Sequence, residues 1–302
     1  MARPFDYEYD HDHDVPHEAV MSGILYLVAT PIGNLADITL RALSTLGEAD
    51  LIAAEDTRVT RKLLAHYDIH TPMTPYHQHS IGRKAERLVA LLHEGKNIAM
   101  VSDAGTPGVS DPGHELIALA IEHEIPIVAI PGPNAVITAL IVSGLSTRRF
   151  TFEGFPPRPA NERRTFFGSL EDEPRTMVFY ESPLRLLATL RSMLEVLGDR
   201  RVAIVREATK MFEEIHRGTV GSAIERFAAV KPKGEITIVV EGASVSAAEA
   251  PGDQVEDALK QFLDEGMSER DAIRQVTALY SLPRKEVYAR MLKMKQGDED
   301  HE

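Results

Sequence analysis

Cysteine is absent from the 302 residues of this chain. The protein therefore has no disulfide framework and no zinc site built on thiolates. It also lacks any apolar run near the roughly 20 residues that a membrane-spanning helix needs. The N-terminal residues are acidic and rich in histidine, without the apolar stretch of a signal peptide. These absences, in a chain that is 43% hydrophobic and 26% charged, predict a cytoplasmic enzyme with enough length for two domains and no membrane partner.

Nucleotide-binding fingerprints are missing as well. The first apolar segment, residues 23–29, is not followed by G-x-G-x-x-G, and no glycine-rich loop ends in a P-loop lysine. Nicotinamide cofactors and ATP are therefore disfavoured. No motif requires a metal. The alternating Asp and His of residues 10–14 could bind one weakly, but a solvated tail is the better interpretation, because an ordered site needs ligands held in fixed geometry.

Positive charge is in deficit, and the net charge is −13. Most of the deficit lies at the two ends, because residues 1–22 carry −5 and residues 298–302 carry −4. The intervening chain carries only −4. It is therefore close enough to neutral to hold a local basic groove for a nucleic acid.

What the sequence does contain is a regular alternation of short apolar strands and helices from residue 23 onward. The first expected strands are 23–29, 51–54, 98–101 and 127–130, and the expected helices are 38–46, 60–67, 83–93, 115–123 and 134–142. Asp37 is the predicted N-cap of the first helix. This alternation predicts a parallel sheet with helices on both faces.

A second region and a small helical appendage follow. The expected strands of the second region are 151–152, 176–180, 202–206, 214–218 and 235–240, with helices at 183–197 and 220–228. Residues 244–252 have the composition of a linker, and three helices are expected after it, at 255–265, 269–280 and 284–295. The chain thus divides into a disordered tail (1–22), an N-terminal α/β domain (23–133), a C-terminal α/β domain (134–243) and an appendage (252–296).

Loops rich in glycine and proline follow three of the expected strands, at residues 30–34, 102–107 and 131–134. Ligands of open α/β sheets bind beyond the carboxyl ends of the strands, and glycine lets the main chain approach them closely. Asp103 could accept ribose hydroxyls or a ligand ammonium, or it could bond its own backbone in an Asx-turn. The polar residues 55–58 end the second expected strand at the same edge, and this position favours a site over a simple helix start.

These loops belong to a longer set of strings. In order, the chain contains ATPIGNLADITLRAL, AAEDTR, VSDAGTP, SDPG, PGP, EGF, FYESP and KGE. The set resembles the small-subunit ribosomal RNA 2′-O-methyltransferases that modify a cytidine in the decoding region, within the tetrapyrrole-methylase-like class of S-adenosylmethionine enzymes. The resemblance covers about residues 23–242 and extends more loosely to the C-terminal helices. The first loop reads Thr-Pro-Ile-Gly where tetrapyrrole-modifying relatives more often have Gly-Pro-Gly, which favours the ribosomal RNA branch.

The resemblance implies a homodimer in which each chain has two α/β domains, with S-adenosylmethionine in the cleft between them. The first loop would border the cofactor, the loop after residue 101 would hold its polar part, and the second domain would close the cleft. Carried over by position, the residues expected to hold the cofactor are Pro31, Ile32, Gly33, Asp103, Ala104, Gly105, Gly108, Asn134, Ala135, Glu181 and Ala208.

Methyl transfer to a ribose hydroxyl also needs a group that takes the hydroxyl proton, because a 2′-hydroxyl is a poor nucleophile at neutral pH. The cofactor brings the reactive methyl group and the protein orients it. The candidates are Glu55, Asp56, Glu207 and Lys210, with Arg58 placing a phosphate. A lysine could act as the base if burial lowered its pKa. The resemblance does not choose among these residues.

Contact with RNA requires basic groups. Arg158, Arg163 and Arg164 lie in an expected proline-rich loop and predict a mobile RNA-binding lid, with Lys233 as a further candidate. Residues 267–296 hold seven basic and three acidic side chains, a net charge of +4. This appendage is either a helix-turn-helix that binds nucleic acid or a basic helical cap, and the sequence does not separate the two.

The resemblance thus implies S-adenosylmethionine-dependent 2′-O-methylation of a cytidine in small-subunit ribosomal RNA, with the assembled small subunit as partner. One alternative is a methylase of a tetrapyrrole, another small molecule or a protein side chain on the same fold. The first loop and the basic appendage weigh against it. The other is a non-catalytic ribosome assembly factor that keeps the pocket as a relic. The intact strings at 55–58 and 102–107 weigh against that interpretation.

Overall fold

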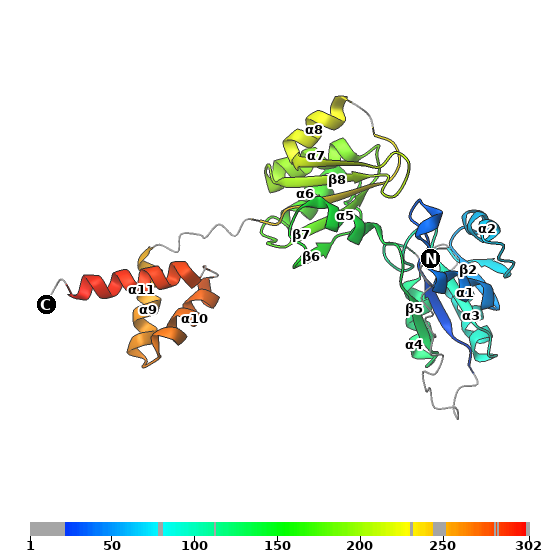
Figure 1. The fold of residues 1–302 in the computed structure, drawn as a ribbon, viewed down its shortest axis with the longest axis horizontal. Helices are drawn as coiled ribbons and strands as arrows, with labels where there is room; N and C mark the ends of the chain where they lie inside the picture. The colour runs from blue at the N-terminus through cyan, green and yellow to red at the C-terminus, as the bar shows by residue number, and fades with distance from the viewer. Residues whose placement is uncertain are drawn as a thin grey trace, which may run out of the picture.

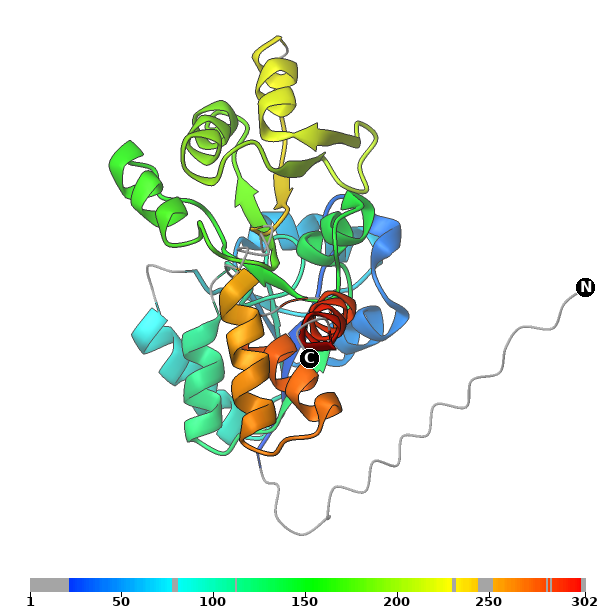
Figure 2. The same cartoon turned by 90° about the vertical axis from the view of Figure 1, so that its left-hand side faces the viewer.

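The computed structural model describes residues 22–77, 81–111, 113–229, 232–243, 252–280, 282 and 284–299. The described part of the chain forms two five-stranded sheets, each with helices packed on it, and a group of three C-terminal helices (Figures 1 and 2). The predicted tail as far as residue 21, with its Asp/His run, and the predicted linker from 244 to 251 lie outside the described residues.

The first sheet is parallel throughout, with strand order β3-β2-β4-β1-β5. Its elements are β1 (Leu25–Val28), a 3-10 turn η1 (Leu35–Asp37), α1 (Leu40–Glu48), β2 (Leu51–Ala54), α2 (Thr57–His66), β3 (Met73–Pro75), α3 (Ile81–His93), β4 (Ile98–Val101), α4 (His114–Glu122) and β5 (Ile127–Ile130). Because all strands run the same way, the loops after β1, β2, β4 and β5 emerge at one edge of the sheet.

Helices cover both faces of this sheet, as the central strand β4 shows. Ile98 and Met100 pack with residues of α3 and α4, whereas Ala99 and Val101 pack with residues of α1 and α2 on the opposite face. Alternate side chains of a strand point to opposite faces, so a strand buried on both sides is apolar throughout. The predicted parallel sheet with helices on both faces is confirmed.

The second sheet is mixed, with strand order β6-β7-β10-β8-β9; β6 pairs parallel with β7 and the other pairs are antiparallel. Its elements are α5 (Ala135–Ser143), β6 (Phe150–Phe152), α6 (Ala160–Gly168), β7 (Thr176–Glu181), α7 (Leu186–Leu197), β8 (Arg201–Arg206), β9 (Glu214–Thr219), α8 (Val220–Ala229) and β10 (Ile236–Val240). Helices α6, α7 and α8 share one apolar core with the sheet, and α5 packs on its other face (Figure 1).

The C-terminal helices are α9 (Gly252–Asp264), α10 (Glu269–Tyr280) and α11 (Arg284–Glu299). They have a core of their own, formed around Val255, Leu259, Val276, Val287 and Met291. All three predicted helices are therefore present, and they pack on one another. In the described part of the chain, no helix combines the length and apolar character needed to cross a membrane.

Three local predictions are wrong. Thr39, not Asp37, caps the first helix, with its hydroxyl 3.1 Å from the Ala42 amide that donates to it. Asp37 instead ends the 3-10 turn, which Asn34 caps. Residues 160–168, expected as loop, form α6, and the short edge strand β3 at residues 73–75 was not expected at all.

Candidate functional site

Hydrogen bonds join the loops that follow β1, β4 and β5. The backbones of Thr30 and Gly105 exchange bonds of 2.9 and 3.0 Å, and the Thr30 hydroxyl donates to the Ser102 carbonyl at 3.2 Å. Asn134 caps α5 by accepting from two backbone amides, while its Nδ2 donates to the Thr106 hydroxyl at 3.3 Å. The convergence of the three loops, expected from parallel strands, is thus enforced by specific contacts.

These loops form one wall of a cavity of about 330 Å³, and loops of the second sheet form the other. The first wall contains Ile32, Ala104, Gly105, Thr106, Val109, Ser110, Asp111, Asn134 and Ala135. The second contains Phe155, Tyr180, Glu181, Ser182, Pro183, Gly234, Glu235, Ile236 and Thr237. The cavity therefore lies between the two sheets and takes residues from both.

The structure brings six of the predicted cofactor residues to this cavity: Ile32, Ala104, Gly105, Asn134, Ala135 and Glu181. Three others, Pro31, Gly33 and Asp103, line a smaller hollow of about 170 Å³ on the first sheet, beside Ser102 and α2. Gly108 and Ala208 belong to neither wall. Their assignment to the cofactor stays a prediction.

Carboxylates at the ends of β2 and β4 each accept a hydrogen bond from the backbone at the end of the other strand. The Asp103 amide donates to the Glu55 carboxylate at 3.2 Å, and the Asp56 amide donates to the Asp103 carboxylate at 3.0 Å. Burial, together with the neighbouring carboxylates, raises the pKa of both Glu55 and Asp103. Asp111 lies close to both and was not among the predicted site residues. Burial and the charge of Glu55 raise the pKa of Asp111 to about 6.

Asp56 and Arg58 are occupied with each other at the start of α2. Asp56 caps the helix through the Arg58 amide at 2.8 Å, and the Arg58 guanidinium reaches its other carboxylate oxygen at 2.6 Å. The bond from the Arg58 side chain lowers the pKa of Asp56 to about 2. So weak a base with its oxygens already bonded argues against Asp56 as the proton acceptor. The Arg58 side chain is 84% exposed and remains available to an anion.

Lys210 forms two ion pairs in the loop between β8 and β9. Its Nζ lies 2.9 Å from Glu207 and 3.0 Å from Glu235. Burial acts to lower the pKa of Lys210, but these two carboxylates outweigh it and raise the pKa. Burial acts to raise the pKa of Glu207, but the bonds from Lys210 and from the Glu235 amide outweigh it and lower that pKa. The hypothesis that burial makes Lys210 a base is therefore wrong, and Glu207 serves to hold the lysine.

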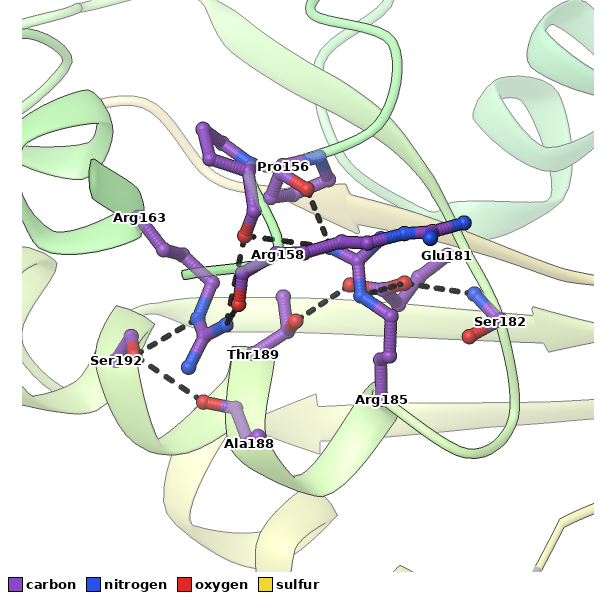
Figure 3. A network of polar contacts seen from close by, with 10 residues as sticks. Pro156, Arg158, Arg163, Glu181, Ser182, Arg185, Ala188, Thr189 and Ser192 are labelled. Carbon is purple, nitrogen blue, oxygen red and sulfur yellow. Dashed lines mark hydrogen bonds and ion pairs between the residues drawn. The ribbon is translucent and has the colours of Figure 1, made fainter. Parts of the chain in front are cut away.

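Glu181 is among the lining residues of the cavity, and its carboxylate is fully buried in a polar network (Figure 3). There it accepts bonds from the Ser182 amide and the Thr189 hydroxyl, and it lies 3.3 Å from Arg185 Nε. Arg185 in turn donates to the Pro156 carbonyl. The buried ion pair thus anchors the loop after β6 to α7.

A second arginine anchors the same loop, which argues against the predicted mobile lid. Arg163 lies in α6 with only 7% of its surface exposed, and it donates to the Ser192 hydroxyl at 3.1 Å and the Arg158 carbonyl at 2.9 Å (Figure 3). Arg164 pairs with Glu195 at 2.9 Å on the surface. The segment 158–164 is therefore a fixed loop followed by a helix. Arg158 and Lys233 are exposed, as RNA contact would need.

Of the cavity residues without a predicted role, three have side chains suited to chemistry or stacking: Asp111, Phe155 and Tyr180. All three lie in sequence motifs that carry the family resemblance, SDPG, EGF and FYESP. Each motif lies at or just after the end of a strand or turn at this edge. Phe155 is 54% exposed, and its ring centroid lies 5.5 Å from that of Tyr180. An exposed aromatic side chain beside a cavity was a signal that the sequence alone could not provide.

Comparison with known proteins then identifies the fold. Residues 24–224 match the tetrapyrrole (corrin/porphyrin) methylases, and residues 249–295 match the RsmI C-terminal HTH domain. The chain belongs to the tetrapyrrole methylase family. It is 47% identical to "Ribosomal RNA small subunit methyltransferase I" of Synechocystis sp., across 90% of this chain and 98% of that protein. It is 46% identical to the protein of the same name from Halalkalibacterium halodurans, across 88% and 93%.

Solved structures of this methylase family have the same fold. A cobalt precorrin-4 methyltransferase superposes with a TM-score of 0.56 at 19% identity, covering 72% of this chain and 94% of that one. The methyltransferase CobJ superposes with a TM-score of 0.57 at 19% identity, covering 74% and 95%. At such identities the likeness concerns the fold alone.

The cofactor of this methylase family is S-adenosylmethionine, and the cavity suits it. Its volume falls within the range of small-molecule sites, and its walls combine apolar side chains with a few polar groups. Gly105 has a φ of +81°, and a Cβ at this position would project to 3.4 Å from Ile32 at the cavity wall. The glycine therefore leaves space for a ligand against the backbone, as expected of a cofactor cradle. The chain is a methyltransferase of this class.

Proposed function

We propose that this protein transfers a methyl group from S-adenosylmethionine to the ribose 2′-hydroxyl of a cytidine in small-subunit ribosomal RNA. The observation that carries the proposal is the 47% identity, along nearly the whole of both chains, to a protein named as a small-subunit ribosomal RNA methyltransferase. The cleft between two sheets adds support, because it presents a cofactor cavity beside carboxyl groups.

The residues of the cleft divide the work between cofactor and substrate. When bound, the cofactor supplies an electrophilic methyl group. Ile32, Ala104 and Gly105 from one sheet, with Ser182 and Pro183 from the other, would hold it in the cavity. Orientation of this kind accounts for much of the rate of a transfer between two bound reactants.

Exposed basic side chains near the cavity would bind the RNA backbone. Arg158 follows the cavity residue Phe155 by three positions, and Lys233 immediately precedes the cavity residue Gly234. Arg58 stands exposed beside the Glu55–Asp103 pair. Phosphate contacts of this type position a nucleic acid, while groups inside the cleft select the reacting nucleotide.

We also propose that the chain has α/β domains at 23–133 and 134–243 and an appendage at 252–296. We propose further that the protein acts in the cytoplasm as a homodimer. Three large apolar side chains on the second sheet's loops support self-association: Leu184, Met211 and Phe212 are 96%, 91% and 68% exposed. Large apolar side chains this exposed are typical of protein interfaces. Light scattering on the purified protein at several concentrations gives the mass directly, and a monomer at all of them contradicts the dimer.

Methyl transfer to purified small subunits tests the function. The subunits come from cells that lack the activity, the cofactor carries a radioactive methyl group, and the label is mapped by ribonuclease digestion. We expect one labelled cytidine, methylated on its 2′-oxygen. The matched control uses subunits from cells that have the activity, which should accept no label. Binding of the cofactor without incorporation into RNA would overturn the ribosomal assignment.

A further inference from the structure

We propose that Asp111 is the catalytic base that takes the proton from the substrate hydroxyl. This inference rests on the proposed function, since it concerns the reaction in the same cleft. Asp111 was assigned no role by sequence reasoning, yet it lines the cavity between the two sheets. It is also half-buried, and the Ser102 hydroxyl after β4 is the neighbouring group that favours its ionised form.

The backbone around Asp111 is wound so that this residue faces the cleft. Gly108 has a φ of +83° and Ser110 a φ of +61°, and both values belong to the left-handed region that ordinary residues resist. A Cβ on Gly154 would lie 3.6 Å from the Ser110 hydroxyl, so this turn touches the loop of the second sheet. Strained backbone held at the junction of two walls is typical of functional sites.

The other carboxylates of the cavity wall have partners already. Glu181 is buried and bonded to Arg185, Thr189 and the Ser182 amide. Glu235 is 72% exposed and paired with Lys210 at 3.0 Å. Among the described residues of this wall, Asp111 is the carboxylate that no arginine or lysine neutralises in an ion pair. It is therefore the one whose oxygens can accept a proton.

The charges that face Asp111 give it suitable basicity. Burial first, then the carboxylates of Glu55 and Asp103, disfavour its ionised form, and the Ser102 hydroxyl partly offsets them. The resulting pKa of about 6 leaves it ionised at neutral pH, yet far more basic than an ordinary aspartate. Tyr180, across the cleft on β7, stays protonated, because burial and the Asp111 charge raise its pKa to about 12.

The proton transfer balances without any further reactant. As the ribose 2′-oxygen forms its bond to the methyl carbon, the carbon–sulfur bond breaks and its electron pair goes to sulfur, which loses its positive charge. The proton of the 2′-hydroxyl passes to a carboxylate oxygen of Asp111. Water then removes it after the methylated RNA leaves.

Replacing Asp111 by asparagine keeps the shape of the side chain and removes its basicity. We expect Asp111→Asn to lower kcat on small subunits at pH 7.5 by about 100-fold or more, the usual contribution of a general base. The dissociation constant of S-adenosylmethionine, measured by calorimetry without RNA, should stay within twofold of the wild type. Asp68→Asn is the matched control, because Asp68 is 94% exposed and belongs to neither wall of the cavity.

The pH profile supplies an independent readout. Log kcat of the wild type should fall with a slope of one below about pH 6. Ser102→Ala removes the hydroxyl that favours the ionised carboxylate, so this limb should move to higher pH. That variant tests the proposal even if Asp111→Asn folds poorly. Asp111→Asn with kcat within threefold of the wild type overturns the proposal. So does a weakened cofactor affinity that accounts for the whole loss, because Asp111 would then hold the cofactor ammonium. A wild type that methylates no RNA would instead refute the proposed function.

Discussion

At the scale of single residues, the cleft gathers Glu55, Asp103 and Asp111, three carboxyl groups whose charges repel each other. Each has a raised pKa, and burial is the first cause in every case. A protein gains no stability from such a cluster, since the ionised form of each group is disfavoured relative to water. The arrangement makes sense as chemistry, because basicity near neutral pH is what a proton acceptor needs.

This cost gives a stability prediction for Asp111→Asn. The carboxyl has a pKa of about 6 in the folded protein and 3.8 ordinarily, so the folded state binds its proton more tightly. Its ionisation therefore destabilises the fold fully above pH 6, and the effect is lost as pH falls below about 4. At pH 7 we expect the asparagine variant to be more stable by about 1 kcal/mol, after discounting solvent screening of a half-buried group.

Urea denaturation at several pH values measures this difference. The gain of the variant over the wild type should shrink steadily between pH 6 and pH 4. Asp68→Asn, which changes an exposed aspartate, should show little difference over the same range. A variant that is equally stable at pH 7 would show that the cluster is solvated enough to ionise freely.

At the scale of elements, the loop after β6 and helix α6 depend on the buried Arg163 and the partly buried Arg185. Arg163 donates to Ser192 and to the carbonyls of Pro157 and Arg158. Truncation to leucine leaves these acceptors without a donor in a buried place, so we expect Arg163→Leu to lose about 2 to 3 kcal/mol of unfolding free energy. Urea denaturation with circular dichroism measures it.

The neighbouring arginine is the control for that change. Arg164→Ala removes an ion pair whose side chains are 50% and 54% exposed, and such pairs contribute less than about 1 kcal/mol. If Arg163 belonged to a mobile RNA-binding loop, Arg163→Leu would weaken RNA binding and leave stability unchanged. Equal stability of the two variants would contradict an anchoring role for Arg163.

The elements themselves show where sequence reasoning succeeds. Strands β2, β4 and β5 were predicted with their observed ends, because short runs of apolar residues between helices have few other interpretations. Helix α6 was missed because Pro156, Pro157 and Pro159 give its start the composition of a loop. The helix is held by Phe167 in the core and by buried Arg163, and neither contact is visible in a local pattern.

The site was predictable in the same uneven way. The loops at 102–107 and 131–134 directly follow strands of a parallel sheet, so their convergence followed from topology. The basicity of Asp111 did not, because it arises from burial and from Glu55, which lies more than 50 positions earlier in the chain. Likewise, Lys210 offered a plausible base until the structure placed two carboxylates on its Nζ.

At the scale of the whole molecule, a chain with a net charge of −13 has to approach a polyanion. Its basic excess is concentrated in residues 267–296, which carry +4 and overlap the match to an HTH domain at residues 249–295. Arg274 and Arg290 are already paired with acids of their own helices, whereas Arg284 and Lys285 lie exposed at the start of α11. That helix start is therefore the part of the appendage best suited to contact phosphates.

We accordingly expect the double change Arg284→Ala and Lys285→Ala to weaken binding to small subunits several-fold at 0.15 M salt. The plot of log affinity against log salt concentration should become less steep, its negative slope shrinking in magnitude by about two, because each lost phosphate contact removes about one released counterion. Cofactor affinity should not change, since the appendage has a separate core from the cleft. Filter binding at four salt concentrations measures the slope. Lys260→Ala, at an exposed lysine on α9, is the control for loss of a positive charge elsewhere in the appendage, and its slope should change by about one at most. An unchanged slope in the double variant would assign the appendage to a structural cap and leave Arg158 and Lys233 at the cleft as the phosphate contacts.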